Sequence, residues 1–208
     1  MEFTCVDHPL VQEKLRLLRD VATPPREFRA LLKEVSVLLA YEALRDLPTD
    51  AAPVQTPLAV ADGLRLRHGP PVLVPILRAG LGMADGLLEL LPAATVGHIG
   101  LYRDHETHRP VTYYRRLPAD IAERDVVLLD PMLATGGSAV AALDILKAEG
   151  VRSVRLVCLV AAPEGVQAVA AAHPDVPMFG AALDLHLNRD AYIVPGLGDA
   201  GDRLYGTL

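Results

Sequence analysis

An acid, two hydroxyls and two adjacent glycines stand close together in the middle part of the chain. The apolar run Val126–Leu129 ends on Asp130, and a short loop with "TGGS" at residues 135–138 leads into a helical pattern. Glycines let backbone amides approach a ligand, and a helix that begins there offers unpaired N–H groups and the positive end of its dipole. These residue types in this order predict a binding site for a monophosphate.

Asp130 narrows this prediction. A carboxylate beside a phosphate site repels the phosphate, but it accepts hydrogen bonds from the vicinal hydroxyls of a sugar, so a ribose 5-phosphate satisfies both groups. The loop is not the nucleotide-triphosphate P-loop, because the G-x-x-x-x-G-K-[ST] spacing is missing. A tight turn in which Ser138 caps the helix is the purely structural alternative.

Arg78 is a second candidate, because it directly follows the short β-branched run Pro71–Leu77. A bidentate, permanently charged guanidinium at the end of a strand suits a pyrophosphate, and an ordinary surface arginine is the alternative. The sequence "GLGMAD" that follows begins like a dinucleotide fingerprint. Asp85 stands where the third glycine belongs, so NAD binding is not predicted.

The last part of the sequence, "YIVPGLGDAGDRLYGT", is rich in glycine around Asp199 and Asp202. This pattern predicts backbone that passes close to a flat ligand, with a glycine-rich closing turn as the alternative. His105 and His108 have a spacing that fits no strong metal template, and solvated loop residues are the better interpretation. We therefore predict no metal site built from protein side chains.

Alternating strands and helices must position these residues. From Pro71 onward the hydrophobic pattern predicts βαβ units and a mostly parallel sheet with helices on both faces. Ligands of such sheets bind at the carboxyl ends of the strands. The pattern is helical before Leu47 and loosens from Pro48 to Pro71 into connections around one or two short elements. Strands are expected at Pro71–Leu77, Ala94–Tyr102, Asp125–Asp130, Val154–Ala162 and Met178–Asp184, and helices up to Leu91, from Ala139 to a C-cap at Gly150, and at Pro163–His173.

Composition sets further bounds. A length of 208 residues predicts one domain, residues 1–208. A net charge of −6, a pI of about 5.6 and only 4% aromatic residues argue against binding of nucleic acid or of an anionic membrane. Two cysteines, Cys5 and Cys158, make neither a disulfide framework nor a metal knuckle. Neither a signal-peptide pattern nor an apolar run of membrane-spanning length occurs, so a cytoplasmic location is expected.

The segment "VLLDPMLATGGS" is similar to the phosphoribosyl-pyrophosphate (PRPP) motif of type I phosphoribosyltransferases. Most of that superfamily has two adjacent acids, and the variant with Pro131 in the second position resembles the uracil phosphoribosyltransferase family. The resemblance extends over nearly the whole chain in five further segments, which are "HPLVQEKL", "VPILRAGLGM", "YRDHET", "LVAAPEGV" and the glycine-rich tail.

This resemblance implies a type I phosphoribosyltransferase fold, with a small hood built from terminal segments and a flexible β-arm or flap. It implies transfer of the 5-phosphoribosyl group from PRPP to N1 of uracil, which gives UMP and pyrophosphate. Asp130 and Arg103 are the implied catalytic residues. The implied PRPP-binding residues are Arg78, Arg103, Asp130, Pro131, Met132, Leu133, Ala134, Thr135, Gly136, Gly137, Ser138 and Asp199. The implied uracil-binding residues are Ile193, Gly198, Asp199 and Ala200.

Three further expectations follow from the resemblance. Mg²⁺ is implied as a cofactor that is bound mainly through PRPP or pyrophosphate, since this ion keeps waters and coordinates substrate oxygens. The segment that starts at Tyr102 is implied to be a flap that closes over the pyrophosphate with Arg103 and excludes water. A homodimer or higher homo-oligomer is also implied. One departure stands before the tail, where Arg189 and Ala191 replace the acid and the glycine that the family often carries.

Two rival functions remain at this point. A phosphoribosyltransferase for orotate or purines is the first, although the carboxylate of orotate calls for a basic partner and "GLGDAGD" is acidic. A non-catalytic pyrimidine sensor that binds RNA is the second, and the low pI and few aromatic residues count against it. The sequence does not decide the oligomeric state, activation by GTP or another nucleotide, or the identity of a general base.

Overall fold

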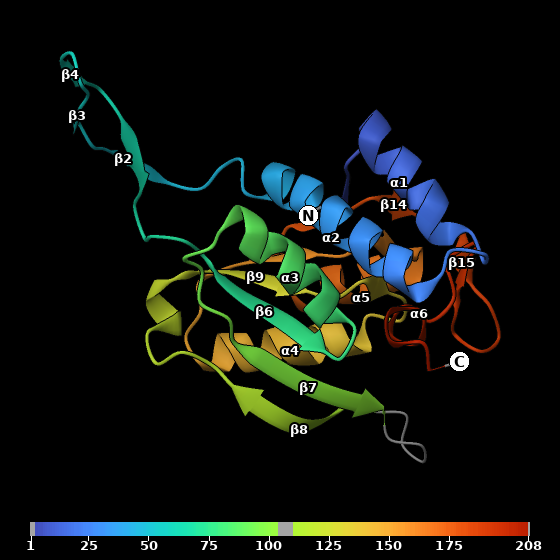
Figure 1. Ribbon diagram of the computed structural model, residues 1–208. Coiled ribbons are helices and arrows are strands. Elements are labelled where there is room, and N and C mark those ends of the chain that lie inside the picture. Colours follow the sequence, from blue (N-terminus) through green and yellow to red (C-terminus); the bar gives the residue numbers. More distant parts are fainter. Residues whose placement is uncertain (1–2, 104–109, 208) are drawn as a thin grey trace.

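A seven-stranded sheet forms the centre of the computed structural model, which describes residues 3–103 and 110–207, and only the backbone of Arg103 (Figure 1). All neighbouring strands of this sheet are parallel except the last pair. The predicted mostly parallel sheet is therefore confirmed. In sheet order the strands are β1 (Phe3–Cys5), β13 (Met178–Gly180), β11 (Ser153–Val157), β9 (Asp125–Leu129), β6 (Val72–Leu77), β7 (His98–Arg103) and β8 (Pro110–Arg116).

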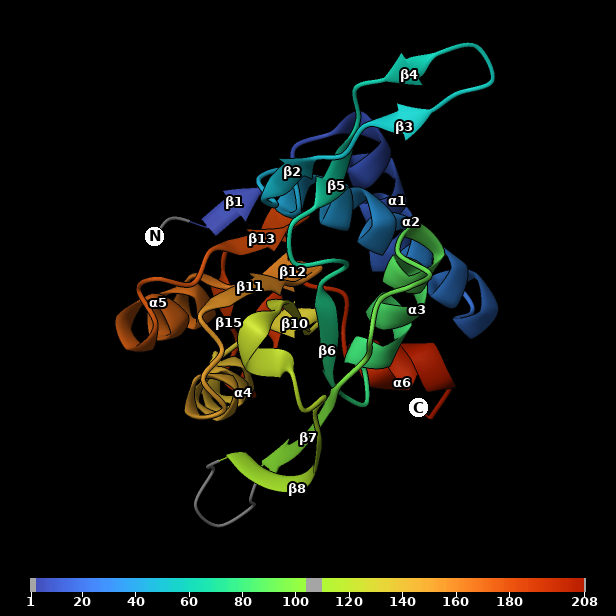
Figure 2. The same ribbon diagram turned by 90° about the vertical axis from the view of Figure 1, so that its left-hand side faces the viewer.

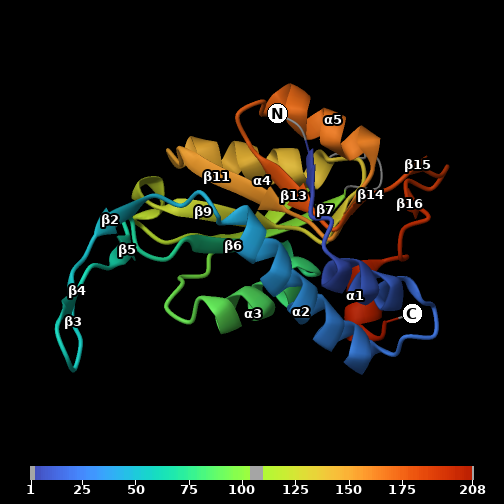
Figure 3. The same cartoon turned by 90° about the horizontal axis from the view of Figure 1, so that it is seen from above.

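Helices cover both faces of the sheet, as expected (Figure 3). Alternate residues of each central strand point to opposite faces, so that Val127 and Leu129 join one buried cluster while Val126 and Leu128 join the other. The continuous apolar runs in the sequence are thus explained by burial on two sides. One face carries α1 (Pro9–Arg19), α2 (Pro25–Ala43) and α3 (Gly80–Leu90), and the other carries α4 (Gly137–Ala148) and α5 (Pro163–Ala172).

Two predicted strands are each divided in the structure, which corrects the expected ranges Val154–Ala162 and Met178–Asp184. After β9, β11 and β13 the chain leaves the main sheet and continues in a second, three-stranded parallel sheet. Pro131 has no N–H to donate, and its carbonyl accepts from both Leu159 N and Val160 N at 3.0 Å, so the regular ladder ends there. The second sheet consists of β10 (Met132–Leu133), β12 (Val160–Ala161) and β14 (Ala182–Leu183).

An arm between α2 and β6 projects from the body of the molecule (Figures 1 and 2). The sequence predicted only loose connections around one or two short elements here, whereas the structure has two antiparallel strand pairs. Leu58 lies in the turn between the strands Val54–Gln55 and Val60–Ala61, and 96% of its surface is exposed. The arm consists of β2 (Thr49–Ala51), β3 (Val54–Gln55), β4 (Val60–Ala61) and β5 (Leu64–Leu66).

The N-terminal helices pack against the C-terminal tail, as the expected hood requires. Arg29 donates to the carbonyl of Leu204 at 2.6 Å, and Arg203 donates to the carbonyl of Asp20 at 2.6 Å. The Arg203 guanidinium also lies 4.5 Å from the ring centroid of Phe28. The tail contains β15 (His186–Leu187), β16 (Ile193–Val194) and α6 (Ala200–Tyr205), and a short 3₁₀ turn, η1 (Ile121–Glu123), precedes β9.

Other boundaries differ from the expected ones by a few residues. β7 begins at His98 rather than Ala94, with only a single bridge from Leu73 to Val96 before it. Gly150, expected as the C-cap of α4, follows the C-cap residue Glu149 and has a left-handed φ of 83°. Within residues 3–103 and 110–207, the helices are too short or too polar to cross a membrane.

Candidate functional site

The loop between β10 and α4 forms a small hollow at the carboxyl end of the sheet. Its volume is about 100 Å³, and it is lined by Asp130, Met132 and the continuous stretch from Leu133 to Ala139. The structure thus brings Asp130 together with the predicted phosphate loop. Pro131 does not line the hollow, because it is buried and its carbonyl is bonded to the neighbouring strand.

Gly136 is required by the backbone and by packing. Its φ is 80°, in the left-handed region, and a Cβ there would lie 2.8 Å from the Ala168 Cβ and 2.9 Å from the Gly165 carbonyl oxygen. A Cβ on Gly137, in contrast, would meet only the Thr135 hydroxyl, at 3.8 Å. Gly137 therefore has open space above it, which leaves its amide accessible to a ligand.

Helix α4 begins without a side-chain cap. Its N-cap residue is Gly136, and no side chain accepts a hydrogen bond from the first turn in the part of the chain that the structure describes. Ser138 lies inside the helix, so the alternative of a Ser138-capped turn is wrong. The uncapped N–H groups and the positive end of the helix dipole face the hollow and suit a phosphate.

Asp130 is the acid of this hollow. Burial raises the pKa of its carboxyl group to about 7, and the Met132 N–H, which donates to Asp130 Oδ1 at 3.4 Å, offsets this only weakly. No lysine or arginine among the described residues pairs with it. A carboxyl group that is only partly exposed and has no cation beside it is suited to bind a ligand that brings hydroxyls or positive charge.

A second hollow of about 390 Å³ adjoins the first. Met132, Ala134 and Thr135 line both hollows, so the two share a wall. The other lining residues come from the C-terminal tail, and they are Asp190, Ala191, Tyr192, Ile193, Gly198 and Asp199. Three of the four predicted base-contacting residues are therefore in the lining, while Ala200 is buried as the first residue of α6.

The loop that precedes β16 is shaped by Asn188, a residue that sequence reasoning missed. Its Oδ1 accepts from Asp190 N at 3.0 Å and from Tyr192 N at 2.9 Å. Ala191 between them has a φ of 62°, which is the left-handed conformation that favours glycine. The departure noted in the sequence thus leaves an alanine in a conformation that costs about 1–2 kcal/mol for a residue with a Cβ.

Arg78 lines neither hollow. It follows β6 directly, its side chain is exposed, and the Leu77–Arg78 peptide is cis. The guanidinium lies 5.6 Å from the ring centroid of Tyr205, whose hydroxyl donates to the Arg78 carbonyl at 3.2 Å. No carboxylate pairs with Arg78 among the described residues. Arg78 therefore presents an unneutralised cation to a ligand.

Some predicted features lie outside the described residues. The structure gives the backbone of Arg103 at the end of β7, and its side chain is outside the description. The central part of the expected flap, residues 104–109 with His105 and His108, is outside it as well. The described residues contain no cluster of three or more His, Cys, Asp or Glu side chains that could hold a metal ion.

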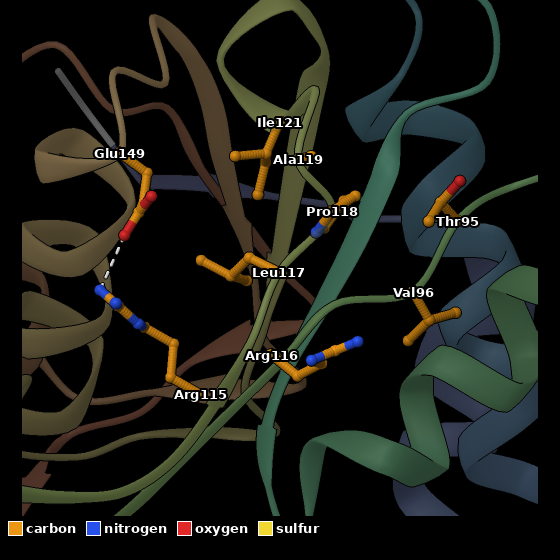
Figure 4. Close-up of a pocket in the computed structure, with 9 residues that line it drawn as sticks. All are labelled: Thr95, Val96, Arg115, Arg116, Leu117, Pro118, Ala119, Ile121 and Glu149. Atoms are coloured by element: carbon orange, nitrogen blue, oxygen red, sulfur yellow. Dashed lines mark hydrogen bonds and ion pairs between the residues drawn. The ribbon is translucent and has the colours of Figure 1, made fainter.

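A larger hollow of about 590 Å³ lies elsewhere (Figure 4). It is located where the parallel strands begin, and Arg115 bridges its rim to Glu149 at 2.7 Å. None of the predicted site residues line it. Since ligands of parallel α/β sheets bind where the strands end, the two smaller hollows are the better candidate site.

Comparison with known proteins agrees with this geometry. The family described as Uracil phosphoribosyltransferase matches residues 5–207. The uracil phosphoribosyltransferase of Symbiobacterium thermophilum is 60% identical over 202 residues, which cover 97% of each chain. That of Ligilactobacillus salivarius is 55% identical over 206 residues and covers 99% of each.

Solved structures show the same fold. A protein from Aquifex aeolicus matches with a TM-score of 0.92 and 39% identity, over 98% of both chains. The adenine phosphoribosyltransferase of Trypanosoma brucei, 14% identical, matches with a TM-score of 0.58 over 86% of this chain and 82% of its own. The fold is thus that of type I phosphoribosyltransferases, and the chain belongs to the uracil phosphoribosyltransferase family.

Proposed function

We propose that this protein transfers the 5-phosphoribosyl group from PRPP to N1 of uracil and releases pyrophosphate, as a step of pyrimidine salvage. The observation that carries this function is the shared wall of Met132, Ala134 and Thr135 between the phosphate hollow and the tail hollow. A phosphate bound at α4 and a base bound at the tail would then be joined by a ribose that spans this wall.

The phosphate hollow would bind the ribose 5-phosphate. Backbone amides from Thr135 to Ser138 and the start of α4 would donate to the phosphate oxygens. The other PRPP contacts would come from residues 132–134 and Asp199. Asp130 would accept from the ribose hydroxyls. The negative charge of Asp130 would stabilise the positive charge that develops on the ribose ring when the bond to pyrophosphate breaks. Asp130 is therefore our candidate catalytic residue.

The tail hollow would read uracil through the backbone. Among its lining residues there is no lysine or arginine, which disfavours the carboxylate of orotate. The backbone at Ile193, Gly198, Asp199 and Ala200 would pair with uracil O2, N3 and O4. A backbone N–H that faces O4 would meet another donor if cytosine were bound, and this mismatch would reject cytosine.

Arg78 and Arg103 would bind the departing pyrophosphate, and Arg103 would be the second catalytic residue. Mg²⁺ would neutralise charge on the pyrophosphate and make it a better leaving group. The donor set fits such an ion, because Asp130 offers one carboxylate beside the phosphate loop and hydrated Mg²⁺ takes its other ligands from substrate oxygens.

The projecting arm supports a homodimer or higher homo-oligomer. Its exposed apolar side chains are Val54, Leu58, Val60 and Leu64, and a row of such residues on an unsupported arm is typical of a surface that is buried in an assembly. We further propose that residues 1–208 form one phosphoribosyltransferase domain that acts in the cytoplasm without nucleic-acid or membrane partners.

One assay tests the proposed reaction. Purified protein is incubated with Mg²⁺ and PRPP, and uracil, cytosine, orotate and hypoxanthine are offered separately. We expect UMP and pyrophosphate in equal amounts with uracil and slow or no reaction with the other bases. Turnover of orotate at the rate of uracil would disprove the proposed reading of the tail.

A further inference from the structure

The tail hollow is the proposed base site and is named the base hollow from here on. The C-terminal segment that lines it is held by a pair of charged residues, and neither of these two residues lines the base hollow or the phosphate hollow. Arg19 ends α1, and Asp184 follows β14. The two Nη atoms of Arg19 donate to the two carboxylate oxygens of Asp184, each at 2.7 Å. This bidentate pair joins residues 165 positions apart in the sequence.

Both groups of the pair also bind the backbone of Gly196. The Gly196 N–H donates to Asp184 Oδ2 at 2.8 Å, and Arg19 Nη1 donates to the Gly196 carbonyl at 2.8 Å. The N–H and the C=O of one residue are therefore both held by the same ion pair. Gly196 has a φ of 58°, and a Cβ there would lie 2.1 Å from the Ile193 carbonyl oxygen. The turn is thus tightly defined.

Gly196 stands between the residues that line the hollow, Ile193 on one side and Gly198 with Asp199 on the other. A shift of Gly196 would shift both sides. The Asp184 side chain has only 5% of its surface exposed and that of Arg19 has 23%, so solvent screens their interaction far less than that of a surface pair. The position of the lining backbone is therefore fixed by groups that do not touch the base.

We infer that Arg19 and Asp184 are positioning residues that determine the affinity and selectivity for the pyrimidine base. The inference rests on the proposed function, in which backbone groups read the base. A side chain that reads a ligand can be aligned by its own rotamers, but a backbone group can be aligned only by whatever holds the chain. Loss of the pair would therefore weaken the discrimination between uracil, whose O4 accepts a hydrogen bond, and cytosine, whose amino group donates one at the same place.

The phosphate hollow provides an internal reference. It is built by β10 and α4, and neither Arg19 nor Asp184 contacts it. Disruption of the pair should then affect the base far more than the phosphoribosyl donor, for which Asp199 is the one proposed contact in the tail. A residue with a merely structural role would lower the amount of folded enzyme, or change both Michaelis constants alike, without such a split.

The test is steady-state kinetics on Arg19→Lys, Arg19→Ala and Asp184→Asn, with each substrate varied in turn and with uracil and cytosine compared. Arg16→Ala is the matched control, because Arg16 lies on the same helix and, among the described residues, forms an ion pair only with the exposed Glu13, at 2.9 Å. Melting temperatures are recorded for every variant. Arg19→Lys keeps the charge but cannot form the bidentate pair, so it tests geometry if the other two variants fail to fold.

For Arg19→Ala and Asp184→Asn we expect the KM for uracil to rise about tenfold or more, with the KM for PRPP within about twofold of the unchanged protein, since hydrogen bonds to charged groups contribute strongly. Arg19→Lys should show the same split to a smaller degree, and the preference for uracil over cytosine should fall in all three. An unchanged KM for uracil, or a parallel change of both constants, would overturn the inference. If the unchanged protein makes no UMP at all, the proposed function fails instead, so the two failures are distinguishable.

Discussion

The two hollows of the candidate site are built in different ways. The phosphate hollow is lined by Asp130 and the continuous stretch from Met132 to Ala139, at the junction of a strand and a helix. The base hollow is completed by an irregular tail, whose turn at Gly196 is held by Asp184, 12 positions earlier, and by Arg19, 177 positions earlier. A site built from one local stretch depends on a few residues that are close in the sequence. A site built from an irregular segment depends on the side chains elsewhere that hold this segment in place.

The largest expected effect is the loss of the acid in the local hollow. Asp130→Asn should lower kcat about a hundredfold or more, because the ribose loses a charged acceptor and the developing positive charge loses its counter-charge. The base hollow should be unaffected, so the KM for uracil should stay within about threefold. Steady-state kinetics check both values, and near-normal turnover would show that Asp130 is not catalytic.

Asp130→Asn should also change how the stability of the protein depends on pH. The pKa of Asp130 in the folded protein is about 7, above the ordinary value of 3.8. The folded protein therefore keeps a proton that the unfolded chain has lost between these two values, and its stability falls as the pH rises through this window. Asp130→Asn removes this titration. Its melting temperature should match the unchanged protein near pH 4 and exceed it by about 5 °C at pH 8. Parallel curves at all pH values would contradict the raised pKa.

Alanine substitutions at two neighbouring glycines of the phosphate hollow distinguish a role in packing from a role in ligand binding. Gly136→Ala should lower stability by about 2–3 kcal/mol, because the left-handed backbone and the close contact with Ala168 both oppose a Cβ. Gly137→Ala meets no such contact, so its melting temperature should stay within about 2 °C. Its KM for PRPP should nevertheless rise if the amide is used by the phosphate. Thermal unfolding and kinetics on the two variants decide this, and equal loss of stability would refute the distinction.

Arg78 lines neither hollow, and its replacement tests whether a cation outside the phosphate hollow binds PRPP. Arg78→Ala should raise the dissociation constant for PRPP about tenfold, because an exposed and unneutralised cation is lost from a preformed position. Direct titration with PRPP measures this. We expect Arg103→Ala to leave the initial binding closer to normal and to lower turnover, since the flap model assigns it to the closed complex. Identical profiles for the two variants would exclude the flap model.

The smallest effect is expected in the base hollow. Ala191→Gly relieves a left-handed conformation, but the glycine makes the unfolded chain more flexible, so the net gain should be about 0.5 kcal/mol. The melting temperature should rise by about 1–2 °C. Ala170→Gly in helix α5 is a suitable control and should lower it instead, because glycine is unfavourable inside a helix. A decrease for Ala191→Gly would mean that the loop tolerates alanine without strain.

The local hollow was largely predictable from the sequence. An apolar strand that ends on Asp130, followed by glycines and a helix, is a short-range pattern, and short-range patterns fix short-range structure. The sequence predicted the end of the first strand at Asp130, but it did not predict the division of the next strand at Cys158 and Leu159. Residues on both sides of this division are buried and apolar, so hydrophobicity carries no signal there, and the absence of an N–H on Pro131 becomes informative only when the partner strand is known.

The anchors of the tail could not be predicted. Arg19 reads as an ordinary arginine at the end of a helix and Asp184 as an acid after a strand, and nothing in their local sequence indicates that they meet. The arm was missed for a related reason. Its strands of two or three residues support no core, so they leave no hydrophobic periodicity, and their exposed leucines and valines look like loop residues.

The ion pair between Arg19 at the end of α1 and Asp184 after β14 also bears on the order of events during synthesis. The residues that line the phosphate hollow end at Ala139, about two thirds of the way along the chain, and the segments that pack against its loop, β12 and α5, follow by Ala172. The base hollow must wait until Gly196 emerges and returns to Arg19, a closure over 177 positions that costs more chain entropy and is formed late. The contacts that form the phosphate hollow are therefore all available before those that hold the base hollow in place.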